Sequence, residues 1–168
     1  DYAARDRRIC LLRNEQNIGL TCSLNRGLER ARGEFIARMD SDDIALPKRF
    51  ELQVQALREN PALVLCGAQT ISIDAQGRRR ARGGGPADNQ VMRWYAVFRP
   101  AMAHPTAMFR ASLVHEGLRY NENCHTAQDY DLWSRMLEYG DASVLQTPLL
   151  LYREHDGAVS SRKRREQA

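Results

Sequence analysis

The sequence predicts an α/β domain with parallel strands. Its first half alternates apolar runs typical of strands with runs of helical spacing, in the order strand, helix, strand, helix. The 168 residues are enough for one domain that buries about two-thirds of its unfolded surface. Hydrophobic residues make up 43% of the chain and charged residues 27%, which excludes an intrinsically disordered chain. No apolar run approaches the roughly 18 residues of a membrane span.

The elements of the first half follow from apolar spacing and from turn residues. A strand and a helix precede Gly33, and a second strand ends in a run of polar residues. The next helix opens with Pro47 in its first turn, stops at Asn60-Pro61 and is expected to bury Phe50, Val54 and Leu57. We therefore predict strands at 9–12 and 35–39, and helices at 20–31 and 47–59.

The second half repeats these signals less regularly. Thr126 to Glu138 gives its clearest helix, with Leu132, Trp133, Met136 and Leu137 on one face. An arginine-rich segment and a run of glycines are expected to form a surface loop. The predicted elements are strands at 63–66, 70–73, 106–109, 142–145 and 149–152, a turn at 74–77, a loop at 78–86 and a further helix at 88–97.

Charge and cysteine usage limit the classes of partner and compartment. The net charge of +4 comes mainly from arginines at 78–82 and basic residues at 162–165, and neither cluster has interleaved aromatic residues. We therefore expect solvated segments and no nucleic-acid partner. The cysteines form no CxxC pair, and two of them lie in apolar runs, so we expect buried free thiols in the cytoplasm. They are Cys10, Cys22, Cys66 and Cys124.

The most informative motif is Asp40-Ser41-Asp42-Asp43, which follows the strand predicted at 35–39. Strand alternation would place Asp40 and Asp42 on the same side, where two carboxylates repel each other unless a cation binds between them. Oxygen ligands alone suit Mg²⁺ or Mn²⁺, and ligands of open α/β sheets bind outside the carboxyl ends of the strands. The alternative is that these residues cap the following helix, and for Asp43 that alternative is equally strong.

A second acidic pair, Asp129 and Asp131, falls in the first turn of the predicted helix at 126–138. Two residues apart on a helix, these carboxylates lie on different faces, so one can support the helix start while the other acts as a general base. His155 follows an apolar strand and could reach a metal site, although a loop histidine is more often inert. The chain contains neither GxSxG nor GxxxxGK[ST] nor GxGxxG.

Together these motifs resemble a family 2 glycosyltransferase of the GT-A fold, over about residues 9–161. The resemblance implies an α/β Rossmann-like nucleotide-diphospho-sugar transferase fold, with a mixed central sheet flanked by helices. The motifs that carry it, in the order of the family, are Asn17-Ile18-Gly19-Leu20, Leu24-Asn25-Arg26-Gly27, Ala31 to Asp43, Pro47-Lys48-Arg49-Phe50, His104-Pro105-Thr106, Phe109-Arg110, Asp129-Tyr130-Asp131-Leu132-Trp133 and Tyr152-Arg153-Glu154-His155.

The same resemblance implies the roles of the site residues. Asp40-Ser41-Asp42 matches the DxD motif, in which Asp42 would coordinate Mn²⁺ or Mg²⁺ on the donor diphosphate and Asp40 would lie near the ribose or the metal. Asp129 matches the catalytic aspartate. The remaining implied roles are support for Asp43, a further metal ligand for His155, and the border of the donor or acceptor cleft for His104 and Arg110.

The chain departs from the family pattern in two places. Gln128 stands where the family usually has Glu before the catalytic aspartate, which keeps hydrogen bonding but loses a charge. The family's first strand and its nucleotide-base-binding segment have no match, so we expect an N-terminally incomplete single domain. Within it, 1–66 would be the remainder of the nucleotide-binding half, and 67–168 the acceptor-binding half with the C-terminal strands. We expect the missing strands to leave a homodimer or an aggregation-prone fragment.

The implied activity is inverting transfer of a sugar from a nucleoside-diphosphate donor, with UDP-sugar expected, to a hydroxyl group. The acceptor would be a sugar, lipid-linked or protein acceptor in cell-envelope polysaccharide synthesis, used in the cytoplasm or by peripheral contact at the inner membrane surface. Two alternatives stay open. One is a metal-dependent phosphohydrolase or nucleotidyltransferase that uses the same acidic residues, and the other is a truncated, non-catalytic assembly domain.

Overall fold

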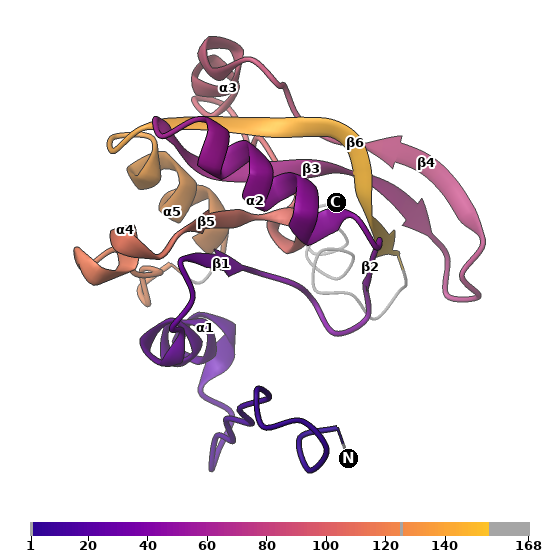
Figure 1. The fold of residues 1–168 in the computed structure, drawn as a ribbon, viewed down its shortest axis with the longest axis vertical. Helices are drawn as coiled ribbons and strands as arrows, with labels where there is room; N and C mark the ends of the chain where they lie inside the picture. The colour runs from indigo at the N-terminus through magenta and orange to yellow at the C-terminus, as the bar shows by residue number, and fades with distance from the viewer. Residues whose placement is uncertain (1, 125, 155–168) are drawn as a thin grey trace.

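A computed structural model describes residues 2–124 and 126–154, which form a six-stranded mixed sheet with helices on both faces (Figure 1). The sheet order is β1-β5-β3-β6-β2, and β4 pairs with β3 off this path. The helices are α1 (Gly19–Arg30), α2 (Arg49–Glu59), α3 (Asn89–Tyr95), α4 (Ala111–His115) and α5 (Gln128–Met136), with a 3-10 turn at His104–Thr106. The strands are β1 (Phe35–Ala37), β2 (Ile44–Ala45), β3 (Leu63–Ile73), β4 (Arg79–Gly83), β5 (Met108–Arg110) and β6 (Asp141–Arg153).

The pairing of the strands corrects the parallel sheet expected from the alternation of elements. Among the described strands only β3 and β6 run parallel, while β1–β5, β3–β5, β3–β4 and β2–β6 are antiparallel. Alternation of strand and helix cannot show that β5 returns between β1 and β3, or that β2 pairs with a strand from the far end of the chain. The mixed sheet implied by the family resemblance is confirmed.

Two pairs of predicted short strands are single long strands. The runs at 63–66 and 70–73 are joined in β3, and the runs at 142–145 and 149–152 are joined in β6. The residues that join the predicted short strands stay in the sheet because β3 and β6 pair with each other. Gln69, for example, pairs with Pro148, with a shift of register on either side of Gln69. Strand β3 also passes through the expected division between residues 66 and 67.

The arginine-rich segment forms a strand where we expected a loop. After the turn at 74–77, β4 pairs antiparallel with β3 and is exposed along its whole length. The backbone and side chain of Arg78 donate to the Asp74 carboxylate, and the backbone bond is the largest cause that lowers the pKa of Asp74 to about 2. Arginines fit an exposed edge strand, where charged side chains remain in water.

Two predictions near the N-terminal half are wrong. Residues 9–12 form no strand, because they pair with no described strand, and Ile9, Leu11 and Leu12 are exposed. Helix α2 buries Leu57 as expected, but it exposes Phe50 and buries the polar residues Arg49 and Gln53. That polar face lies against the sheet because it bonds to backbone carbonyl groups there.

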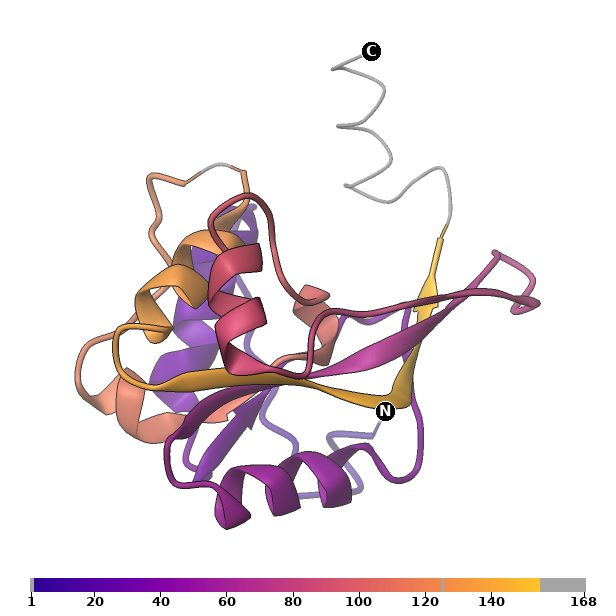
Figure 2. The ribbon, with the colours of Figure 1, turned by 90° about the horizontal axis from the view of Figure 1, so that it is seen from above.

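The core consists of two layers on opposite faces of the sheet. Figure 2 shows α2 alone on one face, and α1, α3, α4 and α5 on the other. The larger layer includes Leu28, Met92 and Leu132 from those helices and Phe109 from β5, and the smaller one packs Leu57 of α2 against β3 and β5. The predicted face of α5 is thus confirmed by the burial of Leu132, Trp133, Met136 and Leu137.

We predict that Gly140→Ala destabilises the fold. A Cβ at Gly140 would lie 2.5 Å from the carbonyl oxygen of Ala62, a backbone atom that cannot move aside easily. We expect a loss of about 1–3 kcal/mol in the free energy of unfolding, measured by urea denaturation. Gly27→Ala is the control, because a Cβ there meets nothing within 4 Å inside α1 and should stabilise the helix by about 0.5–1 kcal/mol. Equal effects of the two substitutions would contradict this packing.

Candidate functional site

The acidic segment Asp40–Asp43 is a turn between β1 and β2, not an extension of a strand. Strand β1 ends at Ala37, so the expected alternation of Asp40 and Asp42 does not apply. The Arg38 guanidinium donates to both carboxylate oxygens of Asp40, with Nη1–Oδ2 and Nη2–Oδ1 distances of 2.5 Å. The Asp42 side chain is exposed, and the Asp43 side chain is buried. The three carboxylates therefore have three different surroundings.

Asp43 ties the acidic segment to the last described strand. Its Oδ1 accepts a hydrogen bond from the backbone N–H of Arg153 (2.8 Å), while its Oδ2 is buried with no described partner. Burial is the largest cause that raises the pKa of Asp43, and the Asp40 and Asp42 carboxylates raise it further. Helix α2 has Lys48 at its N-cap without a side-chain cap, so the helix-capping alternative for Asp43 is not observed.

The Arg153 side chain also links the end of β6 to the acidic turn. Its Nε donates to the carbonyl oxygen of Asp42 (2.8 Å), and its Nη1 donates to the carbonyl oxygen of Asp74 (3.1 Å) at the turn between β3 and β4. The end of β6, the acidic turn and the β3–β4 turn are thus held by one side chain. His155, the expected metal ligand, lies outside the described residues.

Two buried arginines lie behind the acidic segment. Arg38 and Arg49 are 9% and 1% exposed. Arg49 donates through Nη2 to the Arg38 carbonyl oxygen (2.6 Å) and through Nε to Gln53 Oε1, while Gln53 Nε2 donates to the carbonyls of Cys66 and Thr106. Burial lowers the pKa of Arg49, and the negative charge of Asp43 opposes that shift. This polar network joins α2, β3 and the 3-10 turn to the base of the acidic turn.

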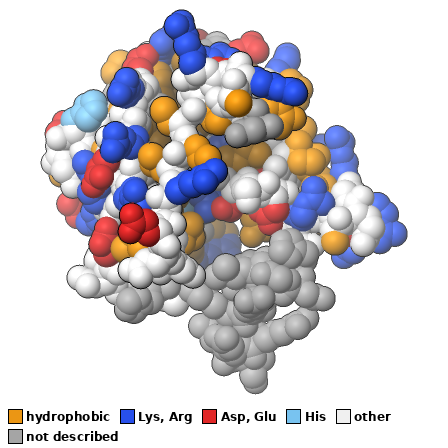
Figure 3. All heavy atoms as spheres, turned by 90° about the horizontal axis from the view of Figure 1, so that it is seen from below, with side chains coloured by type: hydrophobic (Ala, Val, Ile, Leu, Met, Phe, Trp, Pro, Cys, Tyr) orange, Lys and Arg blue, Asp and Glu red, His pale blue; other side chains and the backbone are white. Residues whose placement is uncertain are grey.

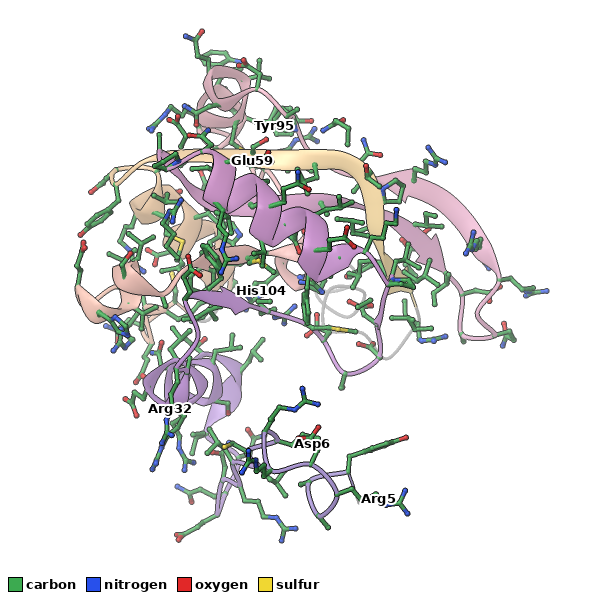
Figure 4. All side chains as sticks on the ribbon, in the orientation of Figure 1. Arg5, Asp6, Arg32, Glu59, Tyr95 and His104 are labelled. Atoms are coloured by element: carbon green, nitrogen blue, oxygen red, sulfur yellow. The ribbon has the colours of Figure 1, made fainter. Side chains whose placement is uncertain are left out.

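His104 lies inside the molecule near β1, whereas Arg5, Asp6 and Arg32 are labelled at its periphery (Figure 4). Its Nε2 is 2.8 Å from the hydroxyl of Tyr120, and its ring packs against Trp133 at 5.7 Å between centroids. Burial, with a smaller contribution from the Arg38 guanidinium, lowers the pKa of His104 to about 3. The imidazole is therefore neutral near pH 7 and serves as a hydrogen-bonding partner of Tyr120.

Asp129 and Asp131 have separate surroundings at the start of α5. The Asp131 carboxylate forms an ion pair with Arg135 (2.6 Å), which also donates to the carbonyl of Arg119. For Asp129 no hydrogen bond or ion pair is found within 2–124 and 126–154, and its side chain is half-buried. The prediction that the two carboxylates face different surroundings is confirmed by these contacts.

Tyr120 relates the two acidic groups to each other. Burial is the main cause that raises the pKa of its phenol; Arg38 opposes the shift, and the Asp129 and Asp40 carboxylates add to it. Asp40 and Asp129, although far apart in the sequence, therefore act electrostatically on one buried hydroxyl group. Arg110 is placed elsewhere: it donates to the carbonyls of Leu57, Leu63 and Asn60 at the end of α2, so we leave it out of the proposed site.

The acidic segment suits an open cation site better than a closed one. Within the described part of the chain, no group of three or more His, Cys, Asp or Glu side chains is arranged to hold a metal ion. Mg²⁺ and Mn²⁺ nevertheless bind through one or two carboxylates when water and substrate phosphates complete the shell. Burial is the largest cause of the raised pKa of Asp43, and the nearby Asp40 and Asp42 carboxylates add to it, so negative charge is concentrated at this turn.

The cysteines differ in part from the sequence prediction. All four cysteines are free, but only Cys66 is buried, and Cys10, expected inside a strand, is exposed. None of the helices in the described ranges has both the length and the apolar character needed to cross a membrane.

We predict that His104→Gln makes the fold less sensitive to acid. Unfolded His104 takes up a proton near pH 6.5, whereas folded His104 does so only near pH 3, so its contribution to stability is complete above pH 6.5 and is lost as the pH falls towards 3. Between pH 7 and 5.5 this residue should remove about 1 kcal/mol from the free energy of unfolding in the wild type. In His104→Gln the glutamine amide can still bond to the Tyr120 hydroxyl, and the free energy of unfolding from urea titrations should lack this pH-dependent loss. His115→Gln, at an exposed position, is the control, and equal pH dependence in all three proteins would contradict the assignment.

Comparisons with known proteins agree with the geometry. A family model described as "Glycosyl transferase family 2" matches residues 1–118. The chain is 35% identical over 151 residues to the amylovoran biosynthesis glycosyltransferase AmsE of Erwinia amylovora, covering 90% of this chain and 56% of that protein. It is 32% identical over 120 residues to the O-antigen biosynthesis glycosyltransferase WbnJ of Escherichia coli, covering 70% of this chain and 45% of that protein.

Solved structures show the same fold. The crystal structure of S. aureus TarS 1-349 superposes with a TM-score of 0.63 at 19% identity, over 83% of this chain and 42% of that chain. The same protein in complex with UDP-GlcNAc gives a TM-score of 0.62 at 18% identity, over 83% and 40%. The GT-A-like fold is therefore confirmed, and the chain spans about half the length of the curated relatives that it matches. The chain belongs to glycosyl transferase family 2.

Proposed function

We propose that this chain is the catalytic part of a glycosyltransferase that moves a sugar from a nucleoside-diphosphate donor to a hydroxyl group with inversion. The observation that carries the proposal is the geometry of the acidic turn, where Arg38 pairs with both oxygens of Asp40 and the Arg153 backbone N–H donates to Asp43. Family membership supports the reaction type. A neighbour of the same fold whose crystal structure holds UDP-GlcNAc supports a UDP-sugar as the donor class.

The acidic turn binds the donor in this proposal. The exposed Asp42 carboxylate would hold Mn²⁺ or Mg²⁺, with Asp40 near the ribose or the metal, and a bound cation supplies positive charge against the departing diphosphate. Asp43 supports the turn through its bond to the Arg153 backbone. We propose His155, two residues after the end of β6 in the sequence, as a further ligand of that cation.

Asp129 is the proposed general base. A base must be ionised and able to reach the acceptor hydroxyl, and the Asp129 carboxylate has no hydrogen bond or ion pair to a described residue that would compete for it. It accepts the proton as the acceptor oxygen attacks the anomeric carbon on the face opposite the leaving diphosphate. Gln128, with a neutral side chain, precedes it at the start of α5. His104 and Tyr120, which bond to each other, are both buried.

The halves of the domain and its partners follow from the same proposal. Residues 1–66 would belong to the nucleotide-binding half and residues 67–168 to the acceptor-binding half. Relatives named for amylovoran and O-antigen biosynthesis support a glycan acceptor, which can be lipid-linked at a membrane surface. We also infer self-association of the chain, because hydrophobic side chains gather at the centre of the face in Figure 3 with basic side chains spread around them.

Product analysis tests the reaction type. The chain is incubated with a UDP-sugar, Mn²⁺ and a panel of glycan acceptors, and the products are separated by mass. We expect a glycosylated acceptor and intact UDP. Release of UMP or inorganic phosphate without a glycosylated product would favour the phosphohydrolase alternative, and absence of heat on titration with Mn²⁺ and UDP would favour the assembly domain.

We predict that Asp129→Asn lowers kcat by at least about 10²-fold while the affinity for UDP stays unchanged, because a general base contributes roughly 10²- to 10⁴-fold. Asp131→Asn is the matched control: it removes a carboxylate two residues away that is already paired with Arg135, and kcat should stay near the wild-type value. Initial rates at saturating donor and titration calorimetry with UDP measure the two quantities. Loss of UDP binding with an unchanged kcat in Asp129→Asn would exclude the assignment.

A further inference from the structure

Asp40 forms an ion pair with Arg38. Both Asp40 oxygens accept from the guanidinium at 2.5 Å, a bidentate arrangement that fixes the plane of the carboxylate. The Arg38 side chain is 8% exposed and that of Asp40 is 37% exposed, so the arginine approaches from the interior and the carboxylate faces outward. The buried Arg38 therefore holds the Asp40 carboxylate from the interior side of the protein.

The position of Arg38 is fixed by its own backbone. Its N–H donates to the carbonyl of Ala107 (2.9 Å), and its carbonyl accepts from Arg49 Nη2 (2.6 Å). The Arg38 guanidinium also acts electrostatically on Asp43, Arg49, His104 and Tyr120. The backbone N–H and C=O of Arg38 are both hydrogen-bonded, and its side chain is buried. The guanidinium is therefore less free to move away from Asp40 than that of a surface arginine.

We propose that Arg38 is a positioning residue that holds Asp40 as an oriented hydrogen-bond acceptor and withholds it from the cation. The inference rests on the proposed function, since it assigns different tasks to the two DxD carboxylates. A carboxylate whose two oxygens already accept from a guanidinium, and whose charge is balanced by it, binds a divalent cation weakly, so cation binding depends mainly on Asp42.

We expect the loss of Arg38 to strengthen metal binding. Removal of the Arg38 charge frees the Asp40 carboxylate from its ion pair and removes a positive charge beside the cation. The affinity for Mn²⁺ should therefore rise, although the orientation of the Asp40 carboxylate is no longer fixed. A residue with a purely structural role would weaken metal binding and turnover together.

The test compares Mn²⁺ affinity by titration calorimetry in the full chain for the wild type, Arg38→Met and Arg38→Gln. Arg38→Gln is included because its amide keeps a donor for Asp40 if Arg38→Met does not fold, and circular dichroism checks each variant. Arg58→Met is the matched control, since it removes an arginine from an exposed ion pair with Glu34 on the outer side of α2. We expect Mn²⁺ to bind at least about threefold more tightly to the Arg38 variants and unchanged to the control.

A double variant, Arg38→Gln with Asp40→Asn, separates the carboxylate from the general change in charge. If the gain comes from a released Asp40, the double variant should lose it. With a UDP-sugar, kcat of Arg38→Gln should fall although its metal affinity rises. Equal or weaker Mn²⁺ binding by folded Arg38→Gln, or no Mn²⁺ binding by either protein, would overturn the inference. Turnover by the wild type decides the proposed function separately.

Discussion

The parallel pairing of β3 with β6 is the constraint on which the site depends. It is the longest ladder of the sheet and joins residues 63–73 to residues 141–153. Because β2 pairs only with β6 among the described strands, the acidic turn between β1 and β2 is anchored at one end through β5 and at the other through β6. The backbone N–H of Arg153 then meets Asp43 at the end of the ladder. A long-range strand pair thus determines where a local acidic motif lies.

Electrostatics explain why that motif is backed by arginines rather than by an apolar core. Three carboxylates lie in four consecutive residues, and their repulsion opposes the fold unless positive charge is nearby. Arg38 pairs directly with Asp40, and Arg49 lies within the electrostatic influence of Asp43. Each buried charge would be unfavourable alone, since burial disfavours the charged form of Asp43 and of Arg49. The opposite charges compensate each other, and the exposed Asp42 remains on the outer side.

Local patterns were sufficient for the helices and insufficient for the pairing of strands. The helices at 20–31 and 126–138 could be predicted because their apolar spacing is set within each helix. The continuity of β3 and β6 could not, because residues such as Gln69 and Pro148 are held in the ladder by a distant partner. The buried face of α2 was missed for the same reason, since spacing favours Phe50 and cannot show that Gln53 bonds to carbonyls from two other elements.

The order of the motifs was enough to predict the acidic segment and Asp129 as candidate site residues. The surroundings of each carboxylate could not be predicted, because they are set by Arg38, Tyr120 and Arg153. One signal was available for Arg38, a charged residue inside an otherwise apolar run. Nothing in the spacing indicates Tyr120, which reaches His104 from a segment without periodicity. Arg153 lies within a quoted motif, yet its contacts to Asp42 and Asp74 depend on two turns far away in the chain.

The buried network behind the turn is better explained by the site than by stability. Buried ion pairs and polar networks add little net stability compared with well-packed apolar groups, because removing charges from water is unfavourable. Here Gln53 bonds to two carbonyls of different elements and to Arg49, which in turn holds the backbone of Arg38. Such directional bonds fix positions, whereas apolar contacts would allow several. A guanidinium held in one place beside Asp40 therefore requires the polar residues of α2 beneath it, and this explains why α2 faces the sheet with Arg49 and Gln53 instead of Phe50.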